Sequence, residues 1–558
     1  MTQIETVGRA AFDDAPLLRG ASTRALDELA HAAREVRVDA RDWLFHAGEG
    51  ADRLYVVLSG RLQVVAPEDG RVLREVGPGA ALGELGLLTG SPRSADVRAV
   101  RDSRLLELEA GSFLRLVEGD GAFALSVARE LARQLQASGG LELPRARPAV
   151  FTVVGVGSAD PRGFADDLSN ALARWGSVAT LDGSDVEPDR FATALLETEG
   201  RFGHVLLLDG PEPWGSFCRR QCDRLIVVGT GEPPAAVKPG LEECELVLVG
   251  VASGAVARWL DAVRPRAHHI VGAEAGARAA GVERVARRLT QRSLGVVLSG
   301  GGARGFAHIG VLAALAEAGF GLDRIGGCSM GSFIAALAAV GRSAEEIEET
   351  CATELVRRSP FNDYTLPRVA LIRSRKAAAM LERVFGAARV EETPRSLYTV
   401  SADLLSSRVV VHRRGSIVDA VGASMSIPGV APPVRRAGRL LVDGGVLNNL
   451  PVDHMAETEE GPIVAVDVIR RLDLSDDGEP PLPTIAETLA RATVLGSVER
   501  AERNRRLALV LIAPEVDAIG LRQWSAIRSA VEAGRQAATR TLEEGGADAL
   551  RAVLDARV

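Results

Sequence analysis

From about residue 151 onwards, short apolar runs that end in glycine or aspartate alternate with stretches of helical periodicity. Runs of this kind are FTVVGVG, HVLLLDG and RLIVVGTG, then IVAVDVI and LALVLIAP near the C-terminus, and FADDLSNALARWG is one of the helical stretches. Strands that are apolar along their whole length are covered on both faces, and the intervening helices provide this cover. The pattern therefore predicts parallel sheets that are buried between helices.

The residues before this region follow a different pattern. Between about residues 15 and 116, apolar and polar residues alternate in short segments separated by glycines, which predicts short strands with frequent turns. The segment GGLELPRARPA has the composition of a linker, and GVERVARRLTQRS that of an Arg-rich helical connector. A length of 558 residues fits roughly three to four domains. We expect domains at residues 1–142, 148–265 and 293–558, with the helical connector at 266–292.

The composition excludes several classes of protein. Asp and Glu number 74 against 66 Lys and Arg, and the net charge of −8 argues against a nucleic-acid binder. The five cysteines are scattered, as in proteins of a reducing compartment, and Cys218 and Cys222 lack a second pair that would complete a zinc site. The N-terminal residues lack a secretory signal pattern, and no run reaches the ~18 apolar residues of a membrane-spanning helix. We therefore expect a soluble cytoplasmic protein without a metal site.

The last block opens with a glycine-rich turn between the apolar run LGVVLS and the helix-like FAHIGVLAALAEAG. Its residues are Gly300, Gly301, Gly302, Ala303, Arg304 and Gly305. Glycines let the backbone turn sharply with converging N–H groups, and the following helix adds its positive end, so the turn suits an anion. An oxyanion hole is one use of such a nest. A plain strand-to-helix turn and a phosphate or dinucleotide loop are the alternatives.

Two further motifs follow in this block. Ser329 lies between Gly327 and Gly331 in the pattern G-x-S-x-G, after a short apolar segment and before the helical SFIAALAAV. In a nucleophile elbow the flanking glycines give room to a sharp turn that lifts the serine hydroxyl out of the sheet. Asp443 begins the sequence Asp-Gly-Gly after the strand-like RRAGRLLV. Taken alone, that pair is best interpreted as a hairpin turn.

Taken together, the three motifs and their flanking residues resemble the patatin-like phospholipase family. The resemblance covers roughly Ser293 to Ile469 and includes GGGARGFAHIGVLAAL, GGCSMGSFIAAL, ASMSIPGVAPP and DGGVLNNLPV. It implies a three-layer α/β/α domain that hydrolyses acyl esters of lipids with a Ser–Asp dyad and no catalytic cofactor. Ser329 would be the nucleophile, Asp443 the general base, and the turn from Gly300 to Gly305 the oxyanion hole.

The chemistry of the residues is consistent with a dyad. A serine hydroxyl is a weak nucleophile and needs a base within hydrogen-bond reach, most often a histidine. Among the eight histidines, His308 falls inside the helix after the glycine turn, where a packing role is the better interpretation. His412 and His454 have no carboxylate placed by the sequence to orient them. The sequence therefore favours a two-residue dyad.

The first block contains a candidate site of its own. Gly83 opens a short helical turn with free N–H groups, Glu84 can accept from a sugar hydroxyl, and Arg93 can pair with a phosphate. The whole segment GELGLLTGSPRSADVRA resembles the phosphate-binding cassette of cyclic-nucleotide-binding β-roll domains. The resemblance implies a site at Gly83, Glu84, Leu85, Arg93 and Ser94, with Glu84 on the ribose 2′-hydroxyl and Arg93 and Ser94 on the cyclic phosphate.

The identity of the ligand stays open at this stage. Asp96 stands where kinase-type domains often carry a small or hydroxylated residue, so cAMP and cGMP are both candidates. Ser138 loosely matches the position that contacts the base. The alternative is a β-roll kept as a docking module without a ligand. DNA binding is not expected, because the chain continues into an α/β block where a transcription factor would carry its recognition helix.

The middle block has one weak motif, Gly155 and Gly157 after a strand, and no G-K-[S/T] of a Walker site follows. With its neighbours it is similar to the neuropathy target esterase branch of patatin-like proteins, in which cyclic-nucleotide-binding-like domains precede the esterase. This resemblance implies a Rossmann-like intermediate domain. Two departures are a single β-roll instead of several, and the lack of the N-terminal membrane helix of the animal members.

The combined prediction is a serine esterase or lysophospholipase that a cyclic nucleotide regulates. A non-enzymatic sensor or scaffold, and an acyltransferase or thioesterase with the same dyad, are the alternatives. The basic segment Arg373-Ser374-Arg375-Lys376 follows the apolar residues 369–372, which suits peripheral contact with an anionic lipid surface, and a solvated helix end explains it equally well.

Overall fold

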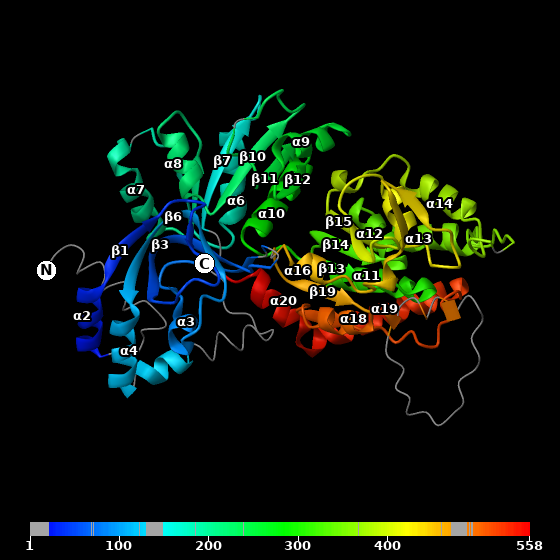
Figure 1. The fold of residues 1–558 in the computed structure, drawn as a ribbon. Helices are drawn as coiled ribbons and strands as arrows, with labels where there is room; N and C mark the ends of the chain where they lie inside the picture. The colour runs from blue at the N-terminus through cyan, green and yellow to red at the C-terminus, as the bar shows by residue number, and fades with distance from the viewer. Residues whose placement is uncertain are drawn as a thin grey trace.

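The computed structural model describes residues 22–129 and 149–469, apart from 69, 71, 122, 185, 238, 367 and 459, and then 488–489, 492 and 495–557. Three sheets follow one another along these residues, as the multi-domain fold class predicted (Figure 1). The first two sheets lie side by side, and the third forms the opposite end of the molecule (Figure 1).

The first domain is an antiparallel β-roll. Its elements are α2 (Thr23–Ala32), β1 (Arg34–Val38), β2 (Trp43–Phe45), β3 (Arg53–Val65), β4 (Val72–Val76), β5 (Ala81–Leu82), α3 (Glu84–Thr89), β6 (Asp96–Glu109) and α4 (Ala110–Gly119). The strands pair in the order β1-β6-β3-β4, with β2 on β6 and β5 on β3. Along β6 buried and half-buried residues alternate, as the sequence pattern predicted, and the apolar ones fill the roll.

The second domain is a parallel sheet with helices on both faces. Its elements are β7 (Val150–Val156), α6 (Pro161–Leu172), β8 (Val178–Leu181), η2 (Pro188–Arg190), α7 (Phe191–Glu199), β9 (His204–Leu208), α8 (Trp214–Gln221), β10 (Arg224–Thr230), β11 (Glu245–Val249), α9 (Ala255–Val263), β12 (Ala267–Val271) and α10 (Ala275–Leu289). The strand order is β12-β11-β10-β7-β9-β8. Val153 contacts the cluster under α6 and α10, whereas Val154 contacts the cluster under α9, so the strands are apolar on both sides.

This domain extends further along the chain than the sequence predicted. Strand β12 pairs in parallel with β11 at the edge of the sheet, and Val282 and Val285 of α10 pack in the same cluster as Phe164 of α6. The expected boundary at residue 265 and the helical connector at 266–292 are therefore corrected: β12 and α10 belong to the second domain. The strand AHHIV escaped notice because its histidines interrupt the apolar run, and the fold buries one of them, His269, against the Glu245 carboxylate at 3.0 Å.

The third domain is a mixed sheet covered on both faces. Its strands are β13 (Gly295–Leu298), β14 (Arg324–Cys328), β15 (Ser396–Asp403), β16 (Arg408–His412), β17 (Val434–Arg436), β18 (Arg439–Asp443), β19 (Ile463–Val466) and β20 (Val510–Ile512). Its helices are η3 (Gly302–Phe306), α11 (Ala307–Glu317), α12 (Met330–Ala339), α13 (Ala344–Cys351), η4 (Ala352–Arg357), α14 (Arg375–Phe385), η5 (Val390–Glu392), α15 (Ile417–Ser424), η6 (Gly444–Val446), α16 (Asp453–Ala456), α18 (Val498–Arg505), η7 (Trp524–Ala526), α19 (Ile527–Thr541), η8 (Leu542–Gly546) and α20 (Ala547–Leu554). The strand order is β17-β18-β15-β14-β13-β19-β20, with β16 on β15.

The two faces of this sheet carry different helices. Val296 and Ile325 pack in the large cluster that includes α11, α12 and α19, whereas Val297 and Cys328 face the cluster that includes Met455 of α16. The layers are thus helices, sheet and helices. The central strands β14 and β13 end beside each other, and the turns that follow them meet at one edge of the sheet, where ligands of parallel sheets are commonly bound.

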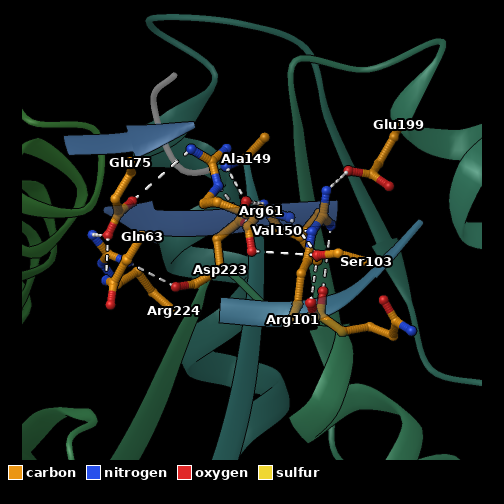
Figure 2. Close-up of polar contacts among 11 residues, drawn as sticks. Arg61, Gln63, Glu75, Arg101, Ser103, Ala149, Val150, Glu199, Asp223 and Arg224 are labelled. Carbon is orange, nitrogen blue, oxygen red and sulfur yellow. Dashed lines mark hydrogen bonds and ion pairs between the residues drawn. The ribbon is translucent and has the colours of Figure 1, made fainter. Parts of the chain in front are cut away.

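Buried ion pairs join the β-roll to the second domain (Figure 2). Asp223, which precedes β10, has a fully buried carboxylate. Its Oδ1 accepts from Nε of Arg61 at 2.8 Å and lies 3.3 Å from Nε of Arg101, while its Oδ2 accepts from the amides of Ala149 and Val150. Although burial raises the pKa of Asp223, the two arginines and the amides hold it well below its ordinary value.

Two further pairs extend this contact (Figure 2). Glu75 of β4 accepts from Arg224 of β10 at 3.0 Å and from Gln63 of β3 at 2.8 Å, and all three side chains are largely removed from water. Arg101 of β6 also donates to Glu199 of α7 at 2.8 Å. A buried charge is stable only with its partners in place, so these pairs fix the orientation of the two domains.

The second domain is joined to the third by pairs of the same kind. Arg288 of α10 contacts Glu245 at 2.6 Å and also pairs with Glu460 of the third domain. Arg287 of α10 pairs with Asp323, the residue before β14, at 2.7 Å. The ion pairs around the second domain therefore reach the start of β14, the strand that leads to Ser329.

Candidate active site

Ser329 stands in a sharp turn between β14 and α12, as the G-x-S-x-G pattern predicted. Its φ of +51° and ψ of −122° are a conformation that side-chain-bearing residues rarely adopt, and its amide donates to the Ser424 hydroxyl at 2.9 Å. A Cβ at Gly327 would lie 2.5 Å from the Gly331 carbonyl carbon, and one at Gly331 would overlap the Leu298 carbonyl. Both flanking positions therefore require glycine because the turn is packed against backbone on each side.

Asp443 ends β18 and faces the same turn. Its carboxylate is buried, and its Oδ1 accepts from the Gly445 amide at 2.8 Å and from the Cys328 thiol at 3.6 Å. Burial raises the pKa of Asp443 to about 6, against the opposing effect of hydrogen bonds from the Ser329 hydroxyl, the Gly445 amide and the Cys328 thiol. The structure thus brings together the two residues that the sequence paired from motifs 114 positions apart (443 − 329).

The histidines lie elsewhere. None of the eight lines the cavity that contains Ser329 and Asp443. His308 is fully buried, its Nε2 lies 2.8 Å from the Ser299 carbonyl, and burial lowers its pKa to about 4. His412 contacts the Ser401 hydroxyl at 2.7 Å. The candidate base for Ser329 is therefore a carboxylate.

The glycine-rich turn contributes fewer donors than the sequence expected. The Gly300 amide donates to the Asn449 carbonyl at 3.1 Å, and the Asn449 side chain donates back to the Gly300 carbonyl at 3.2 Å. A Cβ on Gly300 would lie 2.5 Å from Oδ1 of Asn449 and 3.1 Å from Cβ of Ser329. The Gly300 amide is thus engaged by Asn449, and the absence of a side chain on Gly300 permits the close approach of Asn449 and Ser329. In the part of the chain that is described, no hydrogen bond is found from the amides of Gly301 and Gly302, which also line the cavity.

Arg304 and Gly305 differ from their expected oxyanion role as well. The Arg304 guanidinium donates to the carbonyls of Ile519 at 2.7 Å and Asp517 at 2.9 Å, so it fastens the turn to the loop before α19. A Cβ on Gly305 would overlap the Met330 side chain, so this glycine allows η3 to pack on the start of α12. Among the described residues, Gly301 and Gly302 are therefore the members of the predicted nest whose amides have no partner.

These groups open onto a cavity of about 670 Å³. Ser329, Asp443, Gly301 and Gly302 occupy one part of its wall. The remaining wall is mostly apolar and includes Leu371, Ile372, Met380, Leu381, Val418, Met425, Ile427, Val430 and Trp524. The size and mostly apolar lining of this cavity are those of a small-molecule binding pocket, with its polar groups gathered on one wall.

The sequence missed three residues that touch the predicted catalytic groups. They are Cys328, which donates to Asp443, Ser424, which accepts from the Ser329 amide, and Asn449, which holds Gly300. All three lie in segments on which the family resemblance rested. Their residue types alone gave no signal, because each acts through a contact across the fold.

The candidate nucleotide site of the β-roll is compact. Gly83 has a φ of +88° at the start of α3, and the Arg93 guanidinium lies against it, donating to the carbonyls of Gly83 at 3.1 Å and Arg53 at 2.7 Å. The guanidinium also lies over the Phe45 ring, 4.3 Å from its centroid, and within the described residues its buried Nε has no partner. Glu84 is buried, with Arg74 at 3.7 Å. Both terminal nitrogens of Arg93 therefore donate to backbone carbonyls, and its remaining nitrogen is buried.

The other residues predicted for that site differ in their exposure and in their contacts. Ser94 and Leu85 are exposed, so Ser94 is accessible to a ligand, and Leu85 is 40% exposed on α3. Asp96 accepts from the Ala47 amide at 2.7 Å and lies 3.4 Å from His46, so it closes a loop of the roll. Ser138 lies outside the described residues.

The helix that follows the glycine motif of the second domain, α6, does not offer a free N-terminus to a ligand. Asp160 caps α6 by accepting from the amides of Arg162 and Gly163, both at 3.1 Å. Dinucleotide-binding folds keep this helix end for a pyrophosphate. A carboxylate therefore occupies the position that a phosphate would need. Among the residues with described positions, no group of His, Cys, Asp and Glu has the arrangement of a metal site, and no helix is long and apolar enough to cross a membrane.

Comparison with known proteins agrees with this architecture. The patatin-like phospholipase family matches residues 296–456, and the cyclic nucleotide-binding domain family matches residues 35–120. Across 574 aligned residues the chain is 35% identical to an NTE family protein of Mycobacterium tuberculosis, covering 96% of this chain and 97% of that protein. This chain belongs to the NTE family.

Larger members of the NTE family are also similar. The lysophospholipase nte1 of Neosartorya fischeri is 26% identical over 635 residues, which cover 89% of this chain and 41% of that protein. Human patatin-like phospholipase domain-containing protein 6 is 29% identical over 516 residues, covering 77% of this chain and 37% of that protein. The resemblance inferred from the motifs, to the patatin-like family and its NTE branch, is confirmed.

Proposed function

We propose that this NTE family protein is a serine hydrolase that removes an acyl chain from a lysophospholipid or phospholipid. The observation that supports this best is the apposition of Ser329 and Asp443 in the wall of an apolar cavity of about 670 Å³. The name lysophospholipase, which the Neosartorya fischeri relative carries, supports the same substrate class.

In the proposed reaction, Asp443 accepts the hydroxyl proton of Ser329 while Oγ attacks the ester carbonyl. The tetrahedral oxyanion accepts hydrogen bonds from the amides of Gly301 and Gly302, and donors of this kind contribute about 3–4 kcal/mol each to the lowering of such barriers. Asp443 then gives its proton to the departing alcohol, which leaves an acyl-Ser329 ester. Water repeats the sequence with Asp443 as base, and fatty acid and free Ser329 are regenerated.

The proposal includes a regulatory ligand and a location. The family match of residues 35–120 and the arrangement of Arg93 beside Gly83 support a cyclic nucleotide, cAMP or cGMP, that alters access to Ser329 through the ion pairs between domains. All five cysteines are buried free thiols, which supports a reducing cytoplasmic location.

Acyl transfer and thioester hydrolysis would use the same dyad. They differ from ester hydrolysis only in the group that attacks or leaves the acyl enzyme. Supplying an acceptor alcohol or an acyl thioester in place of the phospholipid separates these reactions.

The test is fatty-acid release from lysophosphatidylcholine by the full-length chain, with and without cAMP or cGMP. We expect Ser329→Ala and Asp443→Asn to lower kcat at least a thousandfold. Ser374→Ala, a serine that lines the same cavity, serves as the matched control and should retain activity. A cyclic-nucleotide effect of about 5- to 150-fold would be ordinary for coupled sites. If wild type releases no acid from this lipid or from a p-nitrophenyl ester, the hydrolase proposal is wrong.

A further inference from the structure

The loop between η4 and α14 lies on the side of the molecule away from the β-roll (Figure 1), and several of its residues, among them Phe361 and Tyr364, line the cavity. Backbone hydrogen bonds hold its base: Tyr364 pairs with Ile372, and the Thr365 amide donates to the Leu371 carbonyl at 3.0 Å. Leu371 and Ile372 are also tied to Gly429 and Val430 by backbone hydrogen bonds of 2.9 and 3.0 Å. The base is therefore a fixed part of the cavity wall.

The tip of this loop exposes large apolar side chains. Leu366 is 87% exposed and Val369 is 69% exposed. Tyr364 and Leu495, which line the cavity, are 60% and 69% exposed, so they form its rim. Apolar side chains gathered at the entrance of an apolar cavity mark an interaction surface more often than scattered ones do.

Positive charge surrounds the same tip. Arg368, Arg373, Arg375 and Lys376 are exposed, and in the described portion of the chain none of the four forms an ion pair. Asp363 is the single acid between residues 359 and 376, and it accepts from the backbone amides of Arg375 and Lys376. The chain as a whole has a net charge of −8, so this concentration of cations is local.

We propose that Leu366, Val369 and these four cations form a docking surface for an anionic lipid membrane. Apolar tips enter the boundary between headgroups and acyl chains, and cations around them pair with anionic headgroups. The inference deepens the proposed function and depends on it for the substrate. Docking would bring the cavity rim to the bilayer, so that a lipid passes from the membrane to Ser329 without crossing water.

Docking is tested with the Ser329→Ala chain, which leaves the vesicles intact. We expect it to co-sediment with phosphatidylcholine vesicles that contain phosphatidylglycerol, and to bind pure phosphatidylcholine at least tenfold more weakly. The pairs Leu366→Ser with Val369→Ser, and Arg368→Glu with Arg373→Glu, should each weaken binding to the anionic vesicles at least tenfold. Leu196→Ser with Arg201→Glu, on the exposed surface of the second domain, is the matched control and should bind normally.

Activity on a soluble p-nitrophenyl ester separates this inference from the proposed function. Loop variants in the active chain should keep wild-type kcat/KM on that ester and lose activity on vesicles. Vesicle binding without ester hydrolysis would contradict the hydrolase proposal and would still support the docking proposal. The docking proposal would be wrong if the parent chain did not bind vesicles, or if the loop variants bound them as well as the control does. It would also be wrong if the loop variants dissociated an oligomer, because the surface would then contact a second copy of the chain.

Discussion

At the scale of single residues, the carboxyl group of Asp443 has lost its water. An ionised carboxylate in that position is stabilised by hydrogen bonds from Ser329, Cys328 and Gly445, and these do not fully replace hydration, so its pKa rises to about 6. A base with a pKa near 6 is ionised at neutral pH and still strong enough to accept the Ser329 proton. The same burial therefore makes Asp443 a stronger base and lowers the stability of the folded chain at a pH where Asp443 is ionised.

The first prediction is a pH profile. Below pH 6 the carboxyl group of Asp443 is protonated and cannot accept the serine proton, so kcat/KM should fall about tenfold for each further pH unit. The profile on a soluble ester should have one acidic limb centred near pH 6. A limb centred near pH 4, where an ordinary Asp titrates, would contradict the assignment of Asp443 as base.

The second prediction concerns stability. The pKa of Asp443 rises from 3.8 to about 6 on folding, so protonation of this carboxyl group stabilises the folded state. This stabilisation is fully present below about pH 4 and is lost as the pH rises through 6. Two units correspond to about 3 kcal/mol. Asp443→Asn removes this pH dependence. The free energy of unfolding of the variant minus that of wild type should therefore be about 3 kcal/mol larger at pH 8 than at pH 4. Urea unfolding of both proteins at the two pH values measures the difference, and an equal difference at both would refute it.

At the scale of elements, α11 and α19 approach so closely that glycine is required at their crossing. A Cβ on Gly310 of α11 would overlap the Val531 carbonyl of α19, and one on Gly534 of α19 would overlap the Ala307 carbonyl of α11. Because η3 leads directly into α11, the position of this helix also sets that of Gly301 and Gly302.

The third prediction follows from this crossing. Gly310→Ala should destabilise the third domain by about 1–3 kcal/mol, since the helices must separate to admit the methyl group. It should also lower kcat/KM, because α11 carries the glycine turn with it. Thermal unfolding and ester hydrolysis measure the two effects. Gly276→Ala, in a helix where the added Cβ contacts nothing, should be neutral or slightly stabilising, and equal losses in both variants would contradict the argument.

At the scale of the whole molecule, buried ion pairs join the domains, whereas each apolar cluster of the described residues lies within a single domain. Asp223 is the centre of this arrangement, because it pairs with Arg61 and Arg101 of the β-roll and accepts hydrogen bonds from two backbone amides of its own domain (Figure 2). Ion pairs of this kind contribute little net stability when complete, and their loss is costly. They specify one orientation of the β-roll on the second domain.

The fourth prediction tests that arrangement. Asp223→Asn removes the charge that lies between the buried guanidinium groups of Arg61 and Arg101, of which Arg101 keeps its pair with Glu199, and should cost about 3–5 kcal/mol. The β-roll should then separate and become sensitive to limited proteolysis, and any effect of cyclic nucleotide on ester hydrolysis should disappear. Arg220→Gln, which removes a partly exposed pair with Asp102, should cost less than about 1 kcal/mol. Equal protection of both variants would show that the ion pairs do not hold the domains together.

The sequence by itself determined the fold class, the family and the positions of Ser329, Asp443, Glu84 and Arg93. The fold class depends on periodic apolar runs, whereas the family and these four site candidates depend on the resemblance of whole motifs to known families. Tertiary structure decided what depends on contacts between distant segments. It assigned β12 and α10 to the second domain, where buried pairing offsets the polarity of His269, and it engaged the Gly300 amide with Asn449. It also raised the pKa of Asp443, because the burial comes in part from segments distant in sequence, such as the turn that carries Cys328 and Ser329.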